Sequence, residues 1–388
     1  MGIPGIDTSE AERLLRLIVA TPSINPAFRA PGDPDEWFGE ARLAGVLAGW
    51  LAEAGIECEI DEVAPGRPNL IARVKGRRGG PRMLWEGHLD TVQVTGMDAP
   101  FEPVLRDGRL YGRGAVDDGG SVAAFLLALR ALAADPPAGD VDVLLAADEE
   151  YNYRGVLHHL ARGEAYALGV AGEPTDLRVV RACKGCVRWT VTLNGRAAHT
   201  SRPEEGVSAL DAARRLLDLH DAEMARRSAR HPLLGPATLV CTGIEAGVGP
   251  NTVPARCTLR FDYRYLPSED GAAVHAAFAA IARSLPEHMS GITVEVAAPF
   301  VNSSAMDVPE EAGIVQHMAA VCAATGLEAA PVGVPFGSDA TKMVNDGGIP
   351  TIVFGPGSID VAHAADEHVA PAEVVRAAGM LVALARGL

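Results

Sequence analysis

In the stretch Met83-Leu-Trp-Glu-Gly-His-Leu-Asp-Thr91, an apolar run is followed directly by His88 and Asp90. A short apolar run predicts a buried strand, and the polar residues then mark its carboxyl end. Similar runs lie at 141–146, 167–171 and 349–354. Helical patterns lie at 40–54, 122–134 and 372–385, and Ser9-Glu-Ala-Glu12 is a capping box that predicts a first helix. Strands that alternate with helices are typical of an α/β fold, so we expect a largely parallel sheet.

The pattern changes after Lys184. It predicts a strand, a helix, two strands, a helix and a strand, at 187–193, 208–226, 237–243, 255–263, 269–285 and 292–297. The order β-α-β-β-α-β is that of the ferredoxin-like unit. A chain of 388 residues also exceeds the size at which a single core usually stops growing. We therefore expect an α/β domain formed by 1–183 and 299–388, with an inserted α+β domain at 184–298.

The chain is strongly acidic, with 50 Asp and Glu residues against 34 Lys and Arg residues and a net charge of −16. An acidic surface repels phosphate backbones and anionic lipids, so neither nucleic acid nor a membrane is an expected partner. No stretch of about 18 apolar residues lacks a charge, and Arg13 and Arg16 interrupt the apolar run near the start. We therefore expect a cytoplasmic protein without a secretory signal or a transmembrane helix.

Histidine and carboxylate residues gather where the expected strands end. Four such groups are His88 with Asp90, Asp148 with Glu149 and Glu150, Glu173, and His363 with Asp366 and Glu367. A fifth, Asp117 with Asp118, precedes the apolar helix at 122–134. Each group alone is better explained as solvated charge. Together they favour a bound cation at the carboxyl edge of the sheet, because clustered carboxylates resist burial unless a cation neutralises them.

The residue types indicate which cation would suit this edge. Imidazole and carboxylate ligands without thiolate suit zinc, and also cobalt or manganese. Two histidines and three carboxylates are enough for two ions that share one bridging carboxylate, about 3.5–4 Å apart. The sequence therefore predicts a site for two divalent metal ions, with zinc as the first expectation.

Several motifs together resemble those of one known family. They are Gly87-His-Leu-Asp90, Gly172-Glu-Pro-Thr175, Arg181-Ala-Cys-Lys-Gly185 and Gly195-Arg-Ala-Ala-His199. The resemblance runs from Pro22 to beyond His363, nearly the whole chain. The chain resembles the dinuclear zinc deacylases and exopeptidases that include acetylornithine deacetylase, succinyl-diaminopimelate desuccinylase, aminoacylase and glutamate carboxypeptidase, and is most similar to acetylornithine deacetylase. This resemblance implies a zinc-exopeptidase-like catalytic domain and an inserted ferredoxin-like domain that serves in dimerisation and as a lid.

The resemblance also implies a role for each matching residue. The metal ligands would be His88, Asp117, Glu150, Glu173 and His363, of which Asp117 would bridge both ions. Glu149 would be the general base, and Asp90 would brace the imidazole of His88. His199 would reach the active site of a partner subunit, which implies a homodimer formed through the inserted domain. The substrate would be held by Asn251, Arg264 and Ser338.

These roles imply an amide hydrolase that removes an acetyl, formyl, succinyl or similar group from the nitrogen of a small amino-acid-like substrate. A dipeptidase or carboxypeptidase with the same metal centre is the alternative, and the released product would distinguish the two. A metal-free binding protein of the same fold is a third hypothesis, which the complete set of ligand residues disfavours.

The chain departs from the family pattern beside two of the expected ligands. It has Asp117-Asp-Gly-Gly120 where the family usually has Asp-Met-Lys-Gly, and Tyr151-Asn-Tyr-Arg154 where the family has small residues. These changes leave the expected ligands in place and alter their surroundings. We therefore consider the hypothesis that Asp118 selects a substrate that carries a basic group.

Overall fold

The computed structural model describes residues 6–77 and 79–388, and the chain divides into two compact units. The large unit comprises the residues up to Arg181 with 308–332 and 338–388. The small unit comprises 182–307 with 333–337. The small unit thus contains the whole range expected for the inserted domain, 184–298, and extends past it to Asp307.

A mixed sheet supports the candidate site. Its strands, in spatial order, are β1 (Cys58–Ala64), β2 (Arg67–Val74), β6 (Val141–Ala146), β3 (Met83–His88), β7 (Leu168–Ala171), β18 (Thr351–Val353), β8 (Val180–Cys183) and β16 (Met306–Asp307), and β17 (Val332–Val334) also pairs with β8. The four strands β6, β3, β7 and β18 run parallel, whereas β1, β2, β8 and β16 pair antiparallel with their neighbours. The expectation of a largely parallel sheet is right for the centre and wrong for the flanks. The connection between β1 and β2 is too short for the crossover that a parallel pair needs.

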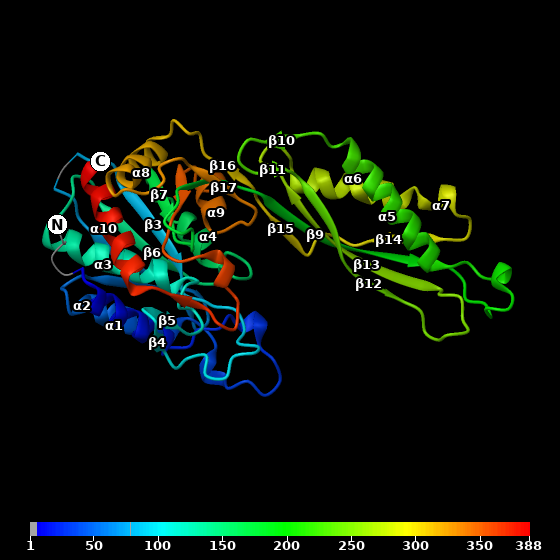
Figure 1. The fold of residues 1–388 in the computed structure, drawn as a ribbon, viewed down its shortest axis with the longest axis horizontal. Helices are drawn as coiled ribbons and strands as arrows, with labels where there is room; N and C mark the ends of the chain where they lie inside the picture. The colour runs from blue at the N-terminus through cyan, green and yellow to red at the C-terminus, as the bar shows by residue number, and fades with distance from the viewer. Residues whose placement is uncertain (1–5, 78) are drawn as a thin grey trace. The chain divides into compact units, whose positions relative to one another are not determined.

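Helices cover both faces of the large unit's sheet (Figure 1). They are α1 (Thr8–Val19), α2 (Ala41–Ala52), α3 (Gly119–Ala134), α4 (Arg154–Leu160), α8 (Gly313–Ala324), α9 (Ala340–Asn345) and α10 (Pro371–Gly387). Helices α1, α3 and α10 pack against one another on one face, and α4 and α9 lie on the other. Helix α3 is buried on nearly every side, as its apolar sequence predicts. None of the helices in the described ranges is both long and apolar enough to span a bilayer.

A smaller sheet and short helical turns complete the large unit. The sheet consists of β4 (Val104–Arg106), β5 (Arg109–Tyr111) and β19 (His368–Val369), with β5 in the middle. The turns are η1 (Pro26–Phe28), η2 (Asp35–Trp37) and η4 (Ile359–Val361). The antiparallel pairing of β19 with β5 holds the segment after His363 beside the segment that leads to Asp117.

Helix α1 begins at a different cap from the one that the sequence predicts. Asp7 is the N-cap, and its carboxylate accepts a hydrogen bond from the Glu10 amide at 2.9 Å. The predicted capping box at Ser9 is therefore wrong, because Ser9 already lies inside the helix. An aspartate two residues earlier supplies the same acceptor for the free amides of the first turn.

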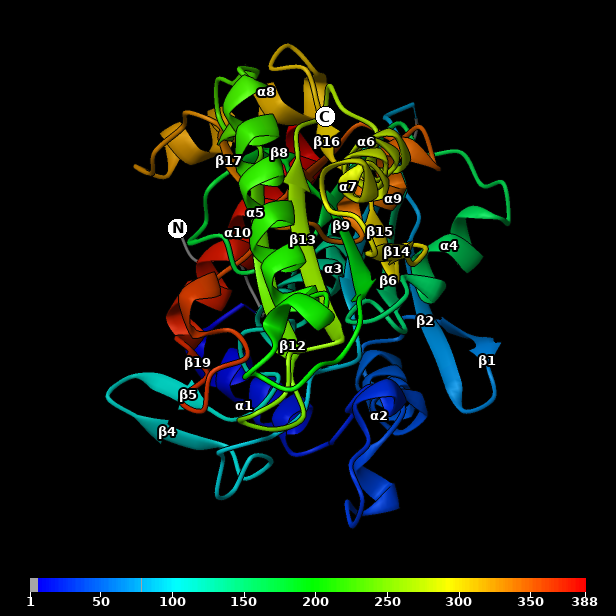
Figure 2. The same ribbon diagram turned by 90° about the vertical axis from the view of Figure 1, so that its right-hand side faces the viewer.

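The small unit has the expected ferredoxin-like order. Its main elements are β9 (Gly185–Asn194), α5 (Ala209–Arg226), β12 (Thr238–Ala246), β13 (Arg256–Tyr265), α6 (Gly271–Arg283) and β14 (Thr293–Val296). The remaining elements are η3 (Pro203–Glu205), β10 (Arg230–His231), β11 (Gly235–Pro236), α7 (Leu285–His288) and β15 (Val301–Ser303). The sheet order is β12-β13-β9-β14 with antiparallel pairing throughout, and α5 and α6 run along one face (Figure 2). These features confirm the predicted fold class.

Candidate metal centre

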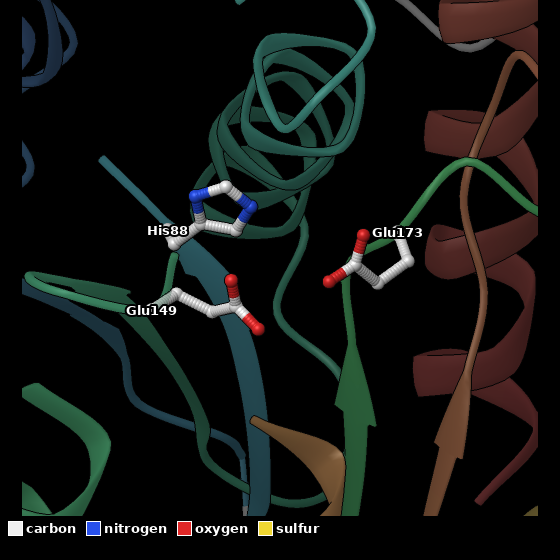
Figure 3. A group of neighbouring side chains, drawn as sticks. All are labelled: His88, Glu149 and Glu173. Atoms are coloured by element: carbon white, nitrogen blue, oxygen red, sulfur yellow. The ribbon is translucent and has the colours of Figure 1, made fainter. Parts of the chain in front are cut away.

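Three side chains from the ends of neighbouring strands meet at the carboxyl edge of the large unit's sheet (Figure 3). His88 ends β3, Glu149 follows β6 and Glu173 follows β7. One ligand atom of each residue lies within 4.8 Å of those of the other two. The carboxylates of Glu149 and Glu173 point toward each other beside the ring of His88. The parallel run of β6, β3 and β7 brings these donors to one place.

A second group of three donors lies in direct contact with the first. It consists of Asp117, Glu150 and His363, whose ligand atoms also lie within 4.8 Å of one another. His363 Nε2 is 3.1 Å from one Asp117 oxygen and 3.0 Å from Glu150 Oε1. The other Asp117 oxygen is 2.9 Å from Nε2 of His88. One carboxylate therefore touches an imidazole of each group, which is the position that a bridging ligand would occupy.

The loops that carry these donors are tightly shaped. At Gly114, φ is +77°, and an added Cβ atom would lie 2.9 Å from the side chain of Thr91. At Gly119, an added Cβ atom would lie 2.1 Å from the carbonyl oxygen of Gly114. His363 itself has a φ of 61°, a left-handed conformation that is uncommon outside glycine and tends to occur at functional sites. The chain thus reaches these positions only with small residues or local strain.

The electrostatics of the site favour a cation. Burial raises the pKa of Glu149 and of Glu173 well above the usual range for a glutamate, and the negative charges around them add to the effect. Burial and the charge of Asp117 raise the pKa of Glu150 to about 7. Hydrogen bonds to Asp117 and Glu150 raise the pKa of His363 to about 10. Carboxylates outnumber imidazoles here, so divalent cations would stabilise the ionised groups, and the donor set fits such ions.

Asp90 acts on the site by a different contact from the expected one. His88 Nδ1 lies 2.9 Å from the backbone carbonyl oxygen of Asp90 and 3.8 Å from its carboxylate. The buried carboxylate accepts hydrogen bonds from the amides of Glu149 at 3.0 Å and Glu150 at 3.2 Å. The carbonyl oxygen of Asp90 therefore orients the imidazole. Its side chain holds the backbone of the two glutamates.

A buried polar network behind Asp90 was not predicted from the sequence. The side-chain amide of Asn25 donates to the carboxylate of Asp90 at 2.7 Å and to that of Asp148 at 2.8 Å. Arg67 pairs with Asp148 at 2.8 Å and with the fully buried Glu40. The only local signal was Asn25 within Pro22-Ser-Ile-Asn-Pro26, because Glu40 and Arg67 are remote in sequence. The network fixes the turn that carries Glu149 and Glu150.

Asp118 is buried, which argues against the hypothesis that it selects a substrate with a basic group. Its side chain is 1% exposed and accepts a hydrogen bond from the His88 amide at 3.2 Å. The same oxygen lies so near Gly87 and Gly172 that a Cβ atom at either position would come within 3 Å of it. Burial raises the pKa of Asp118 to about 7. The residue therefore belongs to the packing beneath the site.

The expected substrate-binding residues lie at separate places. Ser338 is buried in the large unit just before α9, and its hydroxyl accepts from the Ala340 amide at 3.4 Å. In the small unit, the backbone of His199 forms an isolated antiparallel β-bridge with Thr252, the residue after Asn251. Arg264 lies near the other end of β13, where it pairs with Asp262 at 2.8 Å. The structure thus brings His199 near Asn251 but leaves Arg264 a strand's length from both.

The sheet and its two donor groups define a candidate site for two metal ions at the carboxyl edge of an α/β sheet. The sequence profile described as "Peptidase family M20/M25/M40" matches residues 84–387. The chain belongs to this family.

Two relatives support the assignment over most of the chain. An acetylornithine deacetylase of Myxococcus xanthus is 33% identical, with 89% of each chain covered. An acetylornithine deacetylase of Salmonella arizonae is 29% identical, with 92% of this chain and 91% of the relative covered. These matches agree with the resemblance that the motifs carry.

Solved structures share the fold at low sequence identity. A tripeptidase from Staphylococcus aureus has a TM-score of 0.80 at 19% identity, with 98% of both chains covered. The aminopeptidase PepT from Bacillus cereus has a TM-score of 0.80 at 21% identity, also with 98% of both chains covered. A Bacillus subtilis protein described as a dinuclear metal-binding M20 peptidase has a TM-score of 0.70 at 16% identity and covers 98% of this chain and 97% of its own. At these identities the structures establish the fold alone.

Proposed function

We propose that this protein removes an acyl group from the nitrogen of a small amino-acid-like substrate, using two divalent metal ions. The observation that carries the proposal is the Asp117 carboxylate, which touches His88 with one oxygen and His363 with the other. Zinc suits the imidazole and carboxylate donors best, and cobalt or manganese would also suit them. The relatives named acetylornithine deacetylase support an acyl group as the part released.

Each ion would have two ligand residues of its own, and the two ions would share Asp117. One would be held by His88, Glu173 and Asp117, and the other by Glu150, His363 and Asp117. Bound divalent cations acidify a coordinated water and polarise an amide carbonyl. The protein must then supply a group that accepts and returns a proton.

Glu149 is the group that would move the proton. Its carboxylate lies among the donors of the first group, and Asp90 holds its backbone amide. It would take a proton from water as the water oxygen bonds to the carbonyl carbon. The same proton would pass to the nitrogen as the carbon–nitrogen bond breaks, which releases a carboxylic acid and an amine. Glu149 ends the cycle in the state in which it began.

The small unit would complete the site in a homodimer. In this proposal His199 of one protomer donates a hydrogen bond to the carbonyl oxygen in the other, and Asn251 beside it holds the substrate. Arg264 and Ser338 would hold the substrate from the other protomer. The edge position of β12 supports pairing, because its unpaired backbone is available to a second chain. Val240 and Ile244 on this strand are exposed to about half their surface. Such apolar side chains on an edge strand are suited to burial in an interface.

The test is a screen of substrates with product analysis. Acetyl, formyl and succinyl derivatives of several amino acids, and a set of dipeptides, would be incubated with the metal-loaded enzyme. We expect release of a simple acid and the free amino acid, with kcat lowered by about 10²- to 10⁴-fold in Glu149→Gln. Cleavage of the dipeptides alone would instead establish the alternative, a dipeptidase or carboxypeptidase with the same metal centre.

A further inference from the structure

A buried ion pair joins the two loops that carry Asp117 and His363. Arg113 is 3% exposed and Glu367 is 1% exposed, and the guanidinium donates to one carboxylate oxygen of Glu367 at 2.5 Å. The other oxygen accepts hydrogen bonds from the amides of Val116 at 3.0 Å and Asp117 at 3.1 Å. Glu367 thus fixes the backbone at Asp117, the residue whose side chain contacts both donor groups.

Further hydrogen bonds hold Arg113 and Glu367 in place. The Gly112 amide donates to the carbonyl oxygen of Glu367 at 3.1 Å, next to the pairing of β5 with β19. The guanidinium group of Arg113 is also held on its other side, because its Nε donates a hydrogen bond to the Gln93 carbonyl oxygen at 3.1 Å. His363 lies only four residues before Glu367 along the same segment. A shift of Glu367 would therefore move the Asp117 amide relative to His363.

Stability alone is a poor explanation for this pair. Removing two charges from water carries a large desolvation penalty, and apolar residues of similar volume often stabilise a fold at least as well. A buried carboxylate that accepts from two consecutive amides fixes backbone geometry in a way that apolar packing does not. The ion pair therefore contributes mainly by fixing the distance between the loop that carries Asp117 and the loop that carries His363.

We propose that Arg113 and Glu367 are positioning residues that set the distance between Asp117 and His363, and so the affinity of the cation that these residues share with Glu150. The inference rests on the proposed function, since it presupposes a cation at that group. Outer contacts of this kind typically change metal affinity by about 10- to 100-fold when they are removed. The other cation would share Asp117, but its remaining donors are His88 at the end of β3 and Glu173 after β7. The affinity for that cation therefore depends less on Glu367.

The test is titration of the metal-free full-length protein with Co²⁺, followed by calorimetry and by visible absorption. In Glu367→Gln, we expect one of the two binding steps to lose about 10- to 100-fold in affinity and the other to change less. In Arg113→Lys, the charge remains but one amine cannot reproduce both guanidinium contacts, so we expect a smaller loss at the same step. Hydrogen exchange of the metal-free Glu367→Gln protein should be faster at residues 112–118 and 362–369.

Asp142→Asn is the matched control. Asp142 is 1% exposed and pairs with Arg73 and Arg82, but it lies at the start of β6 and Glu149 lies beyond the end. This variant should lose stability without any change in either Co²⁺ affinity. Two unchanged affinities in both Glu367→Gln and Arg113→Lys would overturn the inference, as would an equal change in Asp142→Asn. If Glu367→Gln fails to fold, the Arg113→Lys titration decides. Failure of the unaltered protein to bind Co²⁺ would instead refute the proposed function.

Discussion

The contact between Asp90 and the two glutamates after β6 gives a quantitative prediction for Asp90→Asn. The Asp90 carboxylate accepts from the amides of Glu149 and Glu150 and from the side chain of Asn25. An asparagine has only one acceptor oxygen. Its best orientation keeps the two hydrogen bonds from Asn25 and Glu150, which share one oxygen, and places an NH₂ group against the Glu149 amide. One hydrogen bond to a charged acceptor is lost and two donors then face each other.

The loss of that bond should lower the free energy of unfolding of the metal-free protein by about 1.5–3 kcal/mol. Because the Glu149 amide is no longer held, kcat should fall by about 10- to 100-fold. The assays are urea unfolding in the presence of chelator and steady-state kinetics on the best substrate from the screen. The control is Glu164→Gln, which loosens an ion pair with Arg73 and Arg82 and should leave kcat unchanged. An Asp90→Asn enzyme that is destabilised but retains its full kcat would refute this reasoning.

Glu149→Gln should lower kcat by about 10²- to 10⁴-fold and retain its metal, which metal analysis of the purified variant checks. Asp118→Asn should leave the preference between basic and neutral substrates unchanged, since the side chain is buried beneath His88; a shift in relative kcat/KM would contradict that placement. His220 packs between Phe261 and Phe278, and burial lowers its pKa from 6.5 to about 4. The unfolded chain therefore takes up the proton first as pH falls below 6.5, and the protein should lose about 2 kcal/mol of stability between pH 8 and pH 5 through this group. Urea unfolding of the wild type and His220→Leu at both pH values measures it, and an identical pH dependence in the two would contradict it.

Parts of the fold with a strong local signal were predictable. Strands such as β6 and helix α3 have runs of apolar residues whose length and periodicity identify them without tertiary information. The order of elements in the small unit was predictable for the same reason. The antiparallel flanks of the large sheet and the strand β1 were not predicted, because β1 alternates weakly and is half-exposed. Pairing direction depends on contacts between segments that are distant in sequence.

The candidate site shows the same division. Residue types and motif spacing singled out His88, Glu149 and Glu173, which the structure brings within reach of one another. The sequence could not reveal which atom of Asp90 would meet His88, since that depends on how the chain turns after β3 and β6. A motif identifies a residue, whereas its hydrogen-bond partner is set by the fold.

The metal content of the protein purified without chelator decides whether the two donor groups hold cations. We expect two divalent ions per chain and complete loss of amide hydrolysis on their removal, with recovery when zinc, cobalt or manganese is restored. His363→Ala should retain one ion, held by the donors around His88. A wild-type protein that holds no ion, or that hydrolyses its substrate equally well after chelation, would contradict the account.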